Sequence, residues 1–174
     1  MKLTITALAV VFAASLAGAA QETGKKEKKP HPGLERLKKL TGSWEAETKE
    51  MGKTTVTYRV IAGGSTVMET IMPGTDHEMV TMYHMDGEDL VLTHYCVIGN
   101  QPRMKAAKDS KEGTLDFKCA GGTMKCAAET HMHSAFFTFK DDDHFTAEWS
   151  LMKDGKTDHS MKFEYVRQKK EAAK

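Results

Sequence analysis

Short alternating segments separated by turn residues run from residue 43 to residue 168, and they constrain the fold more than any other feature of the chain. Turn signals such as Asp86-Gly87 and Asp154-Gly155 separate neighbouring segments. We expect about ten strands, at 43–50, 53–62, 65–72, 76–85, 89–98, 102–107, 113–119, 127–139, 144–152 and 158–168. A meander of that many strands removes its exposed edges by closing on itself. The pattern therefore predicts an all-β fold, an antiparallel meander β-barrel.

The first twenty residues, MKLTITALAVVFAASLAGAA, have the layout of a secretory signal peptide. Lys2 is their one charge, an apolar run from Leu3 to Leu16 follows, and small residues end the segment. The run is shorter than the roughly 20 residues that a membrane-spanning helix needs. We therefore expect cleavage after Ala19 or Ala20, a secreted or periplasmic protein, and no membrane span after cleavage.

The segment that follows the predicted signal peptide, QETGKKEKKPHP at 21–32, is charged and contains two prolines, so we expect a flexible linker. Leu34, Leu37 and Leu40 then recur every three residues, which predicts a short helix at 33–40 ahead of the barrel. The barrel domain is expected to span 33–170. The chain carries 25 Lys and Arg against 24 Asp and Glu, a balance that argues against a nucleic-acid partner.

The hairpin at 76–98 sorts its side chains onto two faces. A two- or four-residue loop at Asp86-Gly87 places Tyr83 on one face with Leu92, His94 and Cys96, and Val91 and its alternating neighbours on the other. Both faces are largely apolar, so one lines the interior and the other needs a cover. A helix or a second copy of the chain in a homodimer would supply that cover.

A resemblance to a known family begins at Leu40-Thr41-Gly42-Ser43-Trp44, which follows the predicted helix. This stretch resembles the Gly-x-Trp opening of calycin (lipocalin-like) barrels and looks closest to the nitrobindin-like group. Segments 63–69, 73–79, 92–96 and 99–104 look like a related bacterial family of exported domains of unknown function. The similarity covers about residues 34–168. It implies an antiparallel barrel around a central cavity, with no settled activity.

The same resemblance implies a haem hypothesis. Nitrobindins hold haem through a His on a late strand, and the nearest match here is His159, which alternation places in phase with Phe163 and Tyr165. The nitrobindin pattern has two further alternating glycines after the Trp, where this chain has Ala46 and Thr48. Calycin barrels also pair an Arg with that Trp.

Four residues are our candidates for contacting a small-molecule ligand in the barrel, and two arginines for closing its end. The ligand candidates are Trp44, Tyr83, His94 and His159. The candidates for pairing with the indole of Trp44 are Arg103 and Arg167.

His131-Met132-His133 is the most suggestive local motif for a transition metal. Residues i and i+2 of a strand face the same way, about 6.5–7 Å apart, so both imidazoles can reach one ion. Zinc or copper needs three or four ligands, and the candidates for the others are His94 and Cys96 from the hairpin, or Glu129 one step earlier on the same strand. The alternative is that both histidines lie at the barrel rim or are satisfied by hydrogen bonds.

The three cysteines leave two arrangements open. Cys119 and Cys126 flank Gly121-Gly122, where the chain can reverse, and a disulfide between them is our first interpretation for an exported protein. Cys96 is then the odd thiol. In the alternative, Cys96 takes one partner or joins a metal site.

Taken together, these patterns favour a binding protein over an enzyme. We expect non-catalytic binding of a small apolar or metal-containing ligand in the barrel, with a transition metal or haem as the candidate cofactor. Many of the 12 methionines then either fill the core or line an adaptable cavity. The alternatives are a His-based metal-dependent enzyme and a filled structural barrel without a ligand.

Overall fold

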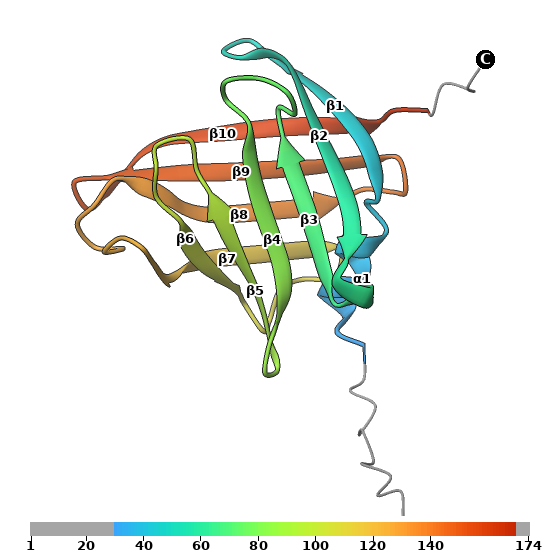
Figure 1. The fold of residues 1–174 in the computed structure, drawn as a ribbon, viewed down its shortest axis with the longest axis horizontal. Helices are drawn as coiled ribbons and strands as arrows, with labels where there is room; N and C mark the ends of the chain where they lie inside the picture. The colour runs from blue at the N-terminus through green and yellow to red at the C-terminus, as the bar shows by residue number, and fades with distance from the viewer. Residues whose placement is uncertain (1–29, 170–174) are drawn as a thin grey trace, which may run out of the picture.

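The computed structural model describes residues 30–169, which form a closed ten-stranded antiparallel barrel with a short helix at one end (Figure 1). The helix is α1 (Pro32–Lys38). The strands are β1 (Gly42–Thr48), β2 (Gly52–Ile61), β3 (Thr66–Ile71), β4 (Met79–Asp86), β5 (Asp89–Tyr95), β6 (Pro102–Ala106), β7 (Thr114–Gly122), β8 (His131–Phe139), β9 (His144–Lys153) and β10 (Lys156–Arg167). A one-turn 3-10 helix, η1 (Ala62–Gly64), joins β2 to β3.

Every strand pairs with its neighbours in the chain, and β1 pairs with β10 to close the barrel. The predicted all-β meander barrel is thus confirmed, and the predicted strands match the observed ones to within a few residues. The predicted signal peptide and most of the predicted linker lie outside the described residues.

Because the meander alternates in direction, its connections gather at two ends. The helix end carries α1, η1 and the β4–β5, β6–β7 and β8–β9 connections. The opposite end, which we call the open end because no helix of residues 30–169 covers it, carries the β1–β2, β3–β4, β5–β6, β7–β8 and β9–β10 connections.

Trp44 and Arg167 seal the helix end. The indole of Trp44 is fully buried and donates its Nε1–H to the carbonyl of Leu40 at 2.7 Å. The Arg167 guanidinium stacks 4.1 Å above the indole ring and donates to the carbonyls of Lys39 and Thr41 at 3.0 and 2.9 Å. Of the two candidate arginines, Arg167 therefore makes the expected contact with the tryptophan.

The β4–β5 hairpin has a two-residue loop between Asp86 and Asp89, so its predicted face assignment applies. Thr81 pairs with His94, Tyr83 pairs with Leu92, and all four side chains are buried. This face is therefore the interior one. On the opposite face, Val91 is buried at 3% exposure, whereas Tyr95 is 49% exposed.

Aromatic and aliphatic side chains fill the barrel interior. The largest aromatic residues there, each at most 1% exposed, are Trp44, Tyr58, Tyr83, Phe117, Phe137 and Phe145. Several of their rings meet edge to face, as Trp44 and Phe145 do at 4.7 Å between centroids. Two surface pockets of about 560 and 500 Å³ lie at the helix end, beside α1. Where the family resemblance implies a central cavity, the interior is thus a packed core.

Candidate functional site

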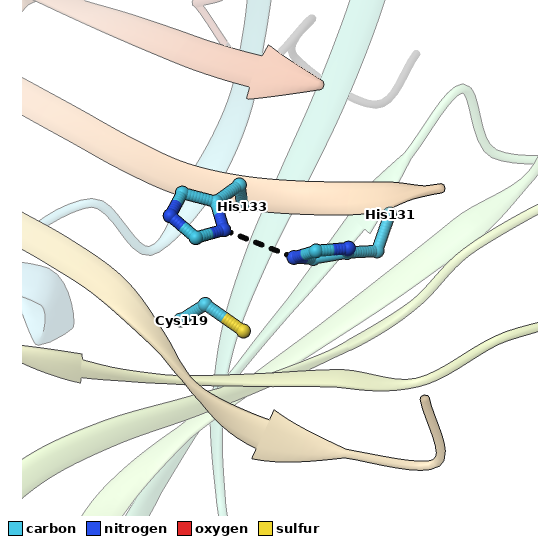
Figure 2. Close-up of side chains that lie close together, drawn as sticks. All are labelled: Cys119, His131 and His133. Carbon is cyan, nitrogen blue, oxygen red and sulfur yellow. Dashed lines mark hydrogen bonds between the residues drawn. The ribbon is translucent and has the colours of Figure 1, made fainter. Parts of the chain in front are cut away.

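Three metal-ligating side chains converge at the open end of the barrel, and we call them the His–Cys cluster: Cys119, His131 and His133. One ligand atom from each lies within 4.8 Å of the others. Figure 2 shows the two imidazole rings extending from β8 toward Cys119 on β7. The structure therefore brings the two predicted histidines together, and the third member of the group is a cysteine that the sequence predicts as a disulfide partner.

Strand register explains the convergence. β7 pairs with β8 through Phe117 opposite Ala135 and Lys118 opposite Ser134, and the next step along this ladder leads from Cys119 to His133. On its other side, β8 slips by one residue against β9 between Met132 and Ser134, which places His133 in a β-bulge. A bulge re-aims the side chains around it. The rings of His131 and His133 therefore approach each other to 5.1 Å between centroids.

His131 is held in one orientation by its own backbone neighbourhood. Its Nδ1 lies 2.5 Å from the carbonyl oxygen of Glu129. A carbonyl oxygen can only accept, so Nδ1 carries the proton, and in the neutral ring Nε2 keeps its lone pair. The His133 Nδ1–H donates to that Nε2 at 3.0 Å. Hydrogen bonding of the distal ring nitrogen to a carbonyl is the usual support of a metal-ligating histidine.

The two histidines differ in their surroundings. His131 is fully buried, whereas His133 is half-buried. Burial, reinforced by the neighbouring His131 and by Lys118, lowers the pKa of His133.

Cys119 has a second partner in Cys126. The two residues form a disulfide with Cα atoms 6.3 Å apart, as expected from their spacing, and both sulfurs lie 3.9 Å from the carbonyl oxygen of Gly121. The same sulfur thus belongs to the cluster and to the disulfide.

His94, an expected metal and ligand contact, lies elsewhere in the interior. Its Nδ1 is 2.9 Å from the Thr81 hydroxyl, and its ring packs 5.0 Å from that of Trp149. Burial lowers the pKa of His94 to about 4. Among residues 30–169, it does not join the group that Cys119 forms with the two histidines.

Cys96, the other expected metal ligand from the hairpin, is the free cysteine of the described chain. It is half-buried against the core, and burial raises the pKa of its thiol. A raised pKa keeps the thiol protonated, which disfavours both metal ligation and nucleophilic attack at neutral pH.

Tyr83, expected to contact a ligand, belongs to a buried network that sequence reasoning missed. Its hydroxyl donates to Oε2 of Glu69 at 2.7 Å, and the Tyr58 hydroxyl donates to Oε1 at 2.6 Å. Burial raises the pKa of Glu69 despite these hydrogen bonds, and it raises the pKa values of both tyrosines well above their usual range. The available signal was an acidic residue in phase with Val67 and Ile71 on an inward-facing strand.

The remaining two ligand candidates, Trp44 and His159, do not line a ligand cavity. Trp44 closes the helix end, as described above. His159 is exposed at the open end, its imidazole 46% accessible and its Nε2 3.8 Å from a Glu50 carboxylate oxygen. Pairing with β9 is regular from His159 to Val166, so His159 keeps its phase with Phe163 and Tyr165. It is exposed because it lies in the 153–160 stretch, where every residue is exposed beyond the end of the core. The exposed ring offers no enclosed haem pocket.

Comparison with known proteins adds no assignment, because no protein-family model and no curated protein matches the chain. Within residues 30–169, no helix has the length and apolar character to span a membrane.

Proposed function

We propose that this protein is an exported β-barrel that binds a transition-metal ion at its open end through His131, His133 and, when the Cys119–Cys126 disulfide is reduced, the Cys119 thiolate. The observation that carries the proposal is the convergence of three ligand atoms within 4.8 Å, one of them on a fully buried imidazole.

The spacing and the type of the donors suit a small ion. Around a tetrahedral zinc ion, neighbouring ligand atoms lie about 3.3–3.8 Å apart, given bonds of about 2.0–2.3 Å. Ligand atoms within 4.8 Å need only side-chain adjustments to reach that spacing. Imidazole nitrogen and thiolate sulfur select zinc or copper over magnesium and calcium, which prefer oxygen.

The loops of the open end support the site. The Asn100 amide donates to the carbonyl of Thr130, next to His131, at 2.8 Å. The backbone of Gln101 exchanges hydrogen bonds with Thr123 across the same two loops, at 2.8 and 3.3 Å. These contacts hold the start of β8 in place before an ion arrives, which favours binding.

We propose binding without catalysis. The carboxylate next in sequence to the cluster belongs to Glu129, and its Oε1 accepts a hydrogen bond from the Lys125 backbone at 3.1 Å. A side chain engaged in its own loop is poorly placed as a general base. The barrel core, filled with aromatic rings, serves as a rigid scaffold for the site.

Export and the family relationship belong to the same proposal. Export is supported by the signal-like first twenty residues and by the cysteine pair, which suits an oxidising compartment. The relationship to nitrobindin-like calycin barrels is supported by the stacking of Arg167 on Trp44 at the closed end of a meander barrel.

The proposal is tested by titrating the protein, expressed without a histidine tag and kept reduced, with Zn²⁺ in a calorimeter. We expect one ion per chain. His131→Ala combined with His133→Ala should weaken binding by about 100-fold or more, because two of the ligands are removed. His77→Ala with His84→Ala is the matched control, since neither residue belongs to the cluster, and it should bind like the unchanged protein. Equal binding by both double variants would disprove the site.

A further inference from the structure

The position of Cys119 creates a conflict that has a chemical consequence. Its sulfur lies within 4.8 Å of the histidine ligand atoms, and it also forms the disulfide with Cys126. The ligand of a metal ion is the thiolate, whereas a disulfide sulfur carries no charge and is a poor donor. One sulfur therefore serves the metal or the disulfide, never both at once.

We infer that the Cys119–Cys126 pair is a thiol–disulfide gate on the metal site, with Cys126 as the fourth ligand of the reduced state. The inference rests on the metal-binding function proposed above. In the reduced state, two thiolates and two imidazoles form a Cys₂His₂ site, the usual donor set of a closed tetrahedral zinc centre. In the oxidised state only the two imidazoles remain as donors.

The chemistry balances with a dithiol as the reductant. A dithiol reduces the disulfide by two electrons and two protons, and it becomes a disulfide itself. The sulfur–sulfur bond breaks, and two thiols form at Cys119 and Cys126. Binding of a divalent ion then releases the two thiol protons to solvent. Reoxidation by peroxide removes two electrons from the thiolates, re-forms the bond with production of water, and expels the ion.

The location of the pair suits such exchange. Cys126 is half-buried, and within the 123–130 loop only Met124 is buried, so a small reductant can approach. Gly121 and Gly122, both with positive φ values of 117° and 127°, lie between the cysteines and permit a chain path that other residues rarely adopt.

The movement needed on reduction is small. Two thiolates on one zinc ion lie about 3.8 Å apart, given Zn–S bonds of about 2.3 Å. The Cα atoms of the cysteine pair are already 6.3 Å apart, so rotation of the side chains opens the sulfurs to that separation. Cys126 lies in the loop between β7 and β8, outside the group of three that already converges, so its sulfur reaches the ion by movement of this loop and not of the two strands.

The experiment compares Co²⁺ and Zn²⁺ binding by the oxidised and the reduced protein in a Cys96→Ser background, which leaves the pair as the only thiols. Cobalt reports thiolate ligation through its sulfur-to-metal charge-transfer absorption. We expect that absorption in the reduced protein only, and affinity at least about 10³-fold weaker in the oxidised protein, because two of four ligands are withdrawn. Cys126→Ser in the same background cannot form the disulfide. It should bind independently of oxidant, with a weaker charge-transfer band from one thiolate.

A second readout is the rate at which peroxide re-forms the disulfide. Saturating Zn²⁺ should slow this reaction at least tenfold, because the ion occupies the thiolates. His131→Ala with His133→Ala should weaken that protection, whereas His77→Ala with His84→Ala should retain it.

The outcomes separate the gate from the metal site itself. Equal affinity in both redox states, lost when the two cluster histidines are replaced, would overturn the gate and leave the metal site standing. Full cobalt–thiolate absorption in Cys126→Ser would remove Cys126 from the ligand set. If the protein bound neither Co²⁺ nor Zn²⁺, whether oxidised or reduced, both the gate and the proposed function would be overturned.

Discussion

Two groups of buried polar side chains occupy this barrel, and they differ in what their polar atoms do. In the interior, each carboxylate oxygen of Glu69 accepts a hydrogen bond from a tyrosine, and His94 is bound to a threonine hydroxyl. At the open end, the acceptor nitrogen of His131 meets only another imidazole, itself a metal ligand type, and a sulfur lies close by.

The comparison teaches that burial alone does not mark a ligand site. The interior network satisfies itself and therefore contributes to stability, because a satisfied buried polar group is costly to disturb. In the His–Cys cluster, an ion that binds the imidazole nitrogens replaces only one hydrogen bond, the one between the His131 and His133 rings. Mutations in the two groups should therefore affect different properties.

The largest expected effect is on stability, from Glu69→Ala. The substitution leaves a cavity and removes the acceptor from the buried hydroxyls of Tyr58 and Tyr83, which should lower the free energy of unfolding by about 3–5 kcal/mol. Chemical denaturation measures it. Zinc affinity should stay within about twofold of the unchanged protein. If Glu69→Ala instead kept its stability and lost zinc affinity, the interior network and the His–Cys cluster would not have separate roles.

The next effect is a pH dependence from His94. Its pKa is about 4 in the folded protein against an ordinary 6.5, so between these values the unfolded chain binds more protons. Stability should therefore fall as pH decreases from about 6.5 to about 4, by roughly 3 kcal/mol in total. His94→Gln keeps a hydrogen-bonding group near Thr81 but does not titrate, so denaturation curves of this variant should lose that slope.

Glu69 supplies a control of opposite sign for the same titration. Burial raises its pKa, so the folded protein binds its proton more tightly than the unfolded chain does. Its contribution to stability is therefore lost as pH rises through the raised value. Glu69→Gln removes this opposing contribution, so the fall in stability on acidification should persist and become steeper. Its loss in this variant would show that His94 is not its source.

The cysteine pair is expected to have a smaller effect on stability. Replacing Cys119 and Cys126 with Ser removes a cross-link between residues seven apart and should cost about 2–3 kcal/mol relative to the oxidised protein. Reduced protein with Zn²⁺ should regain stability, because binding to the folded state is linked to folding. The double serine variant should regain much less. Equal recovery in thermal melts would show that the thiolates are not ligands.

Local patterns were sufficient to predict most of the fold. Alternation and turn dipeptides located the ten strands, and the turn at Asp86-Gly87 sorted the hairpin side chains into two faces. Which of these two largely apolar faces packs inward was left open by the sequence. Three-residue spacing of leucines located α1. These features depend on neighbours in the chain, which is why they are visible in the sequence.

The site depends on register between strands, which local patterns do not specify. The bulge at His133 and the ladder that leads from Lys118 toward Cys119 bring a sulfur of β7 to the two histidines as the third side chain of the cluster. His159 keeps its phase with Phe163 and Tyr165 but lies beyond the end of the core, and alternation does not show where along a strand the core ends. Bulges insert one residue without a strong sequence signal, so the change in side-chain direction beyond them cannot be predicted from alternation. Glu69, by contrast, was detectable in the sequence, because it is a charged residue that alternates with the inward-facing Val67 and Ile71.

The smallest expected effect is on Zn²⁺ affinity, from loss of a loop contact at the open end. Asn100 donates to the carbonyl of Thr130, and this bond ties the β5–β6 loop to the residue before His131. Asn100→Ala should weaken Zn²⁺ binding by about tenfold, in the range of other outer contacts that orient a ligand. Stability should change little, because Asn100 is not part of the barrel core. Gln168→Ala, at the opposite end of the barrel, is the control and should leave zinc affinity unchanged. If Asn100→Ala lowers stability but not affinity, the loop contact serves the fold, and the start of β8 is held by β7 and β9 alone.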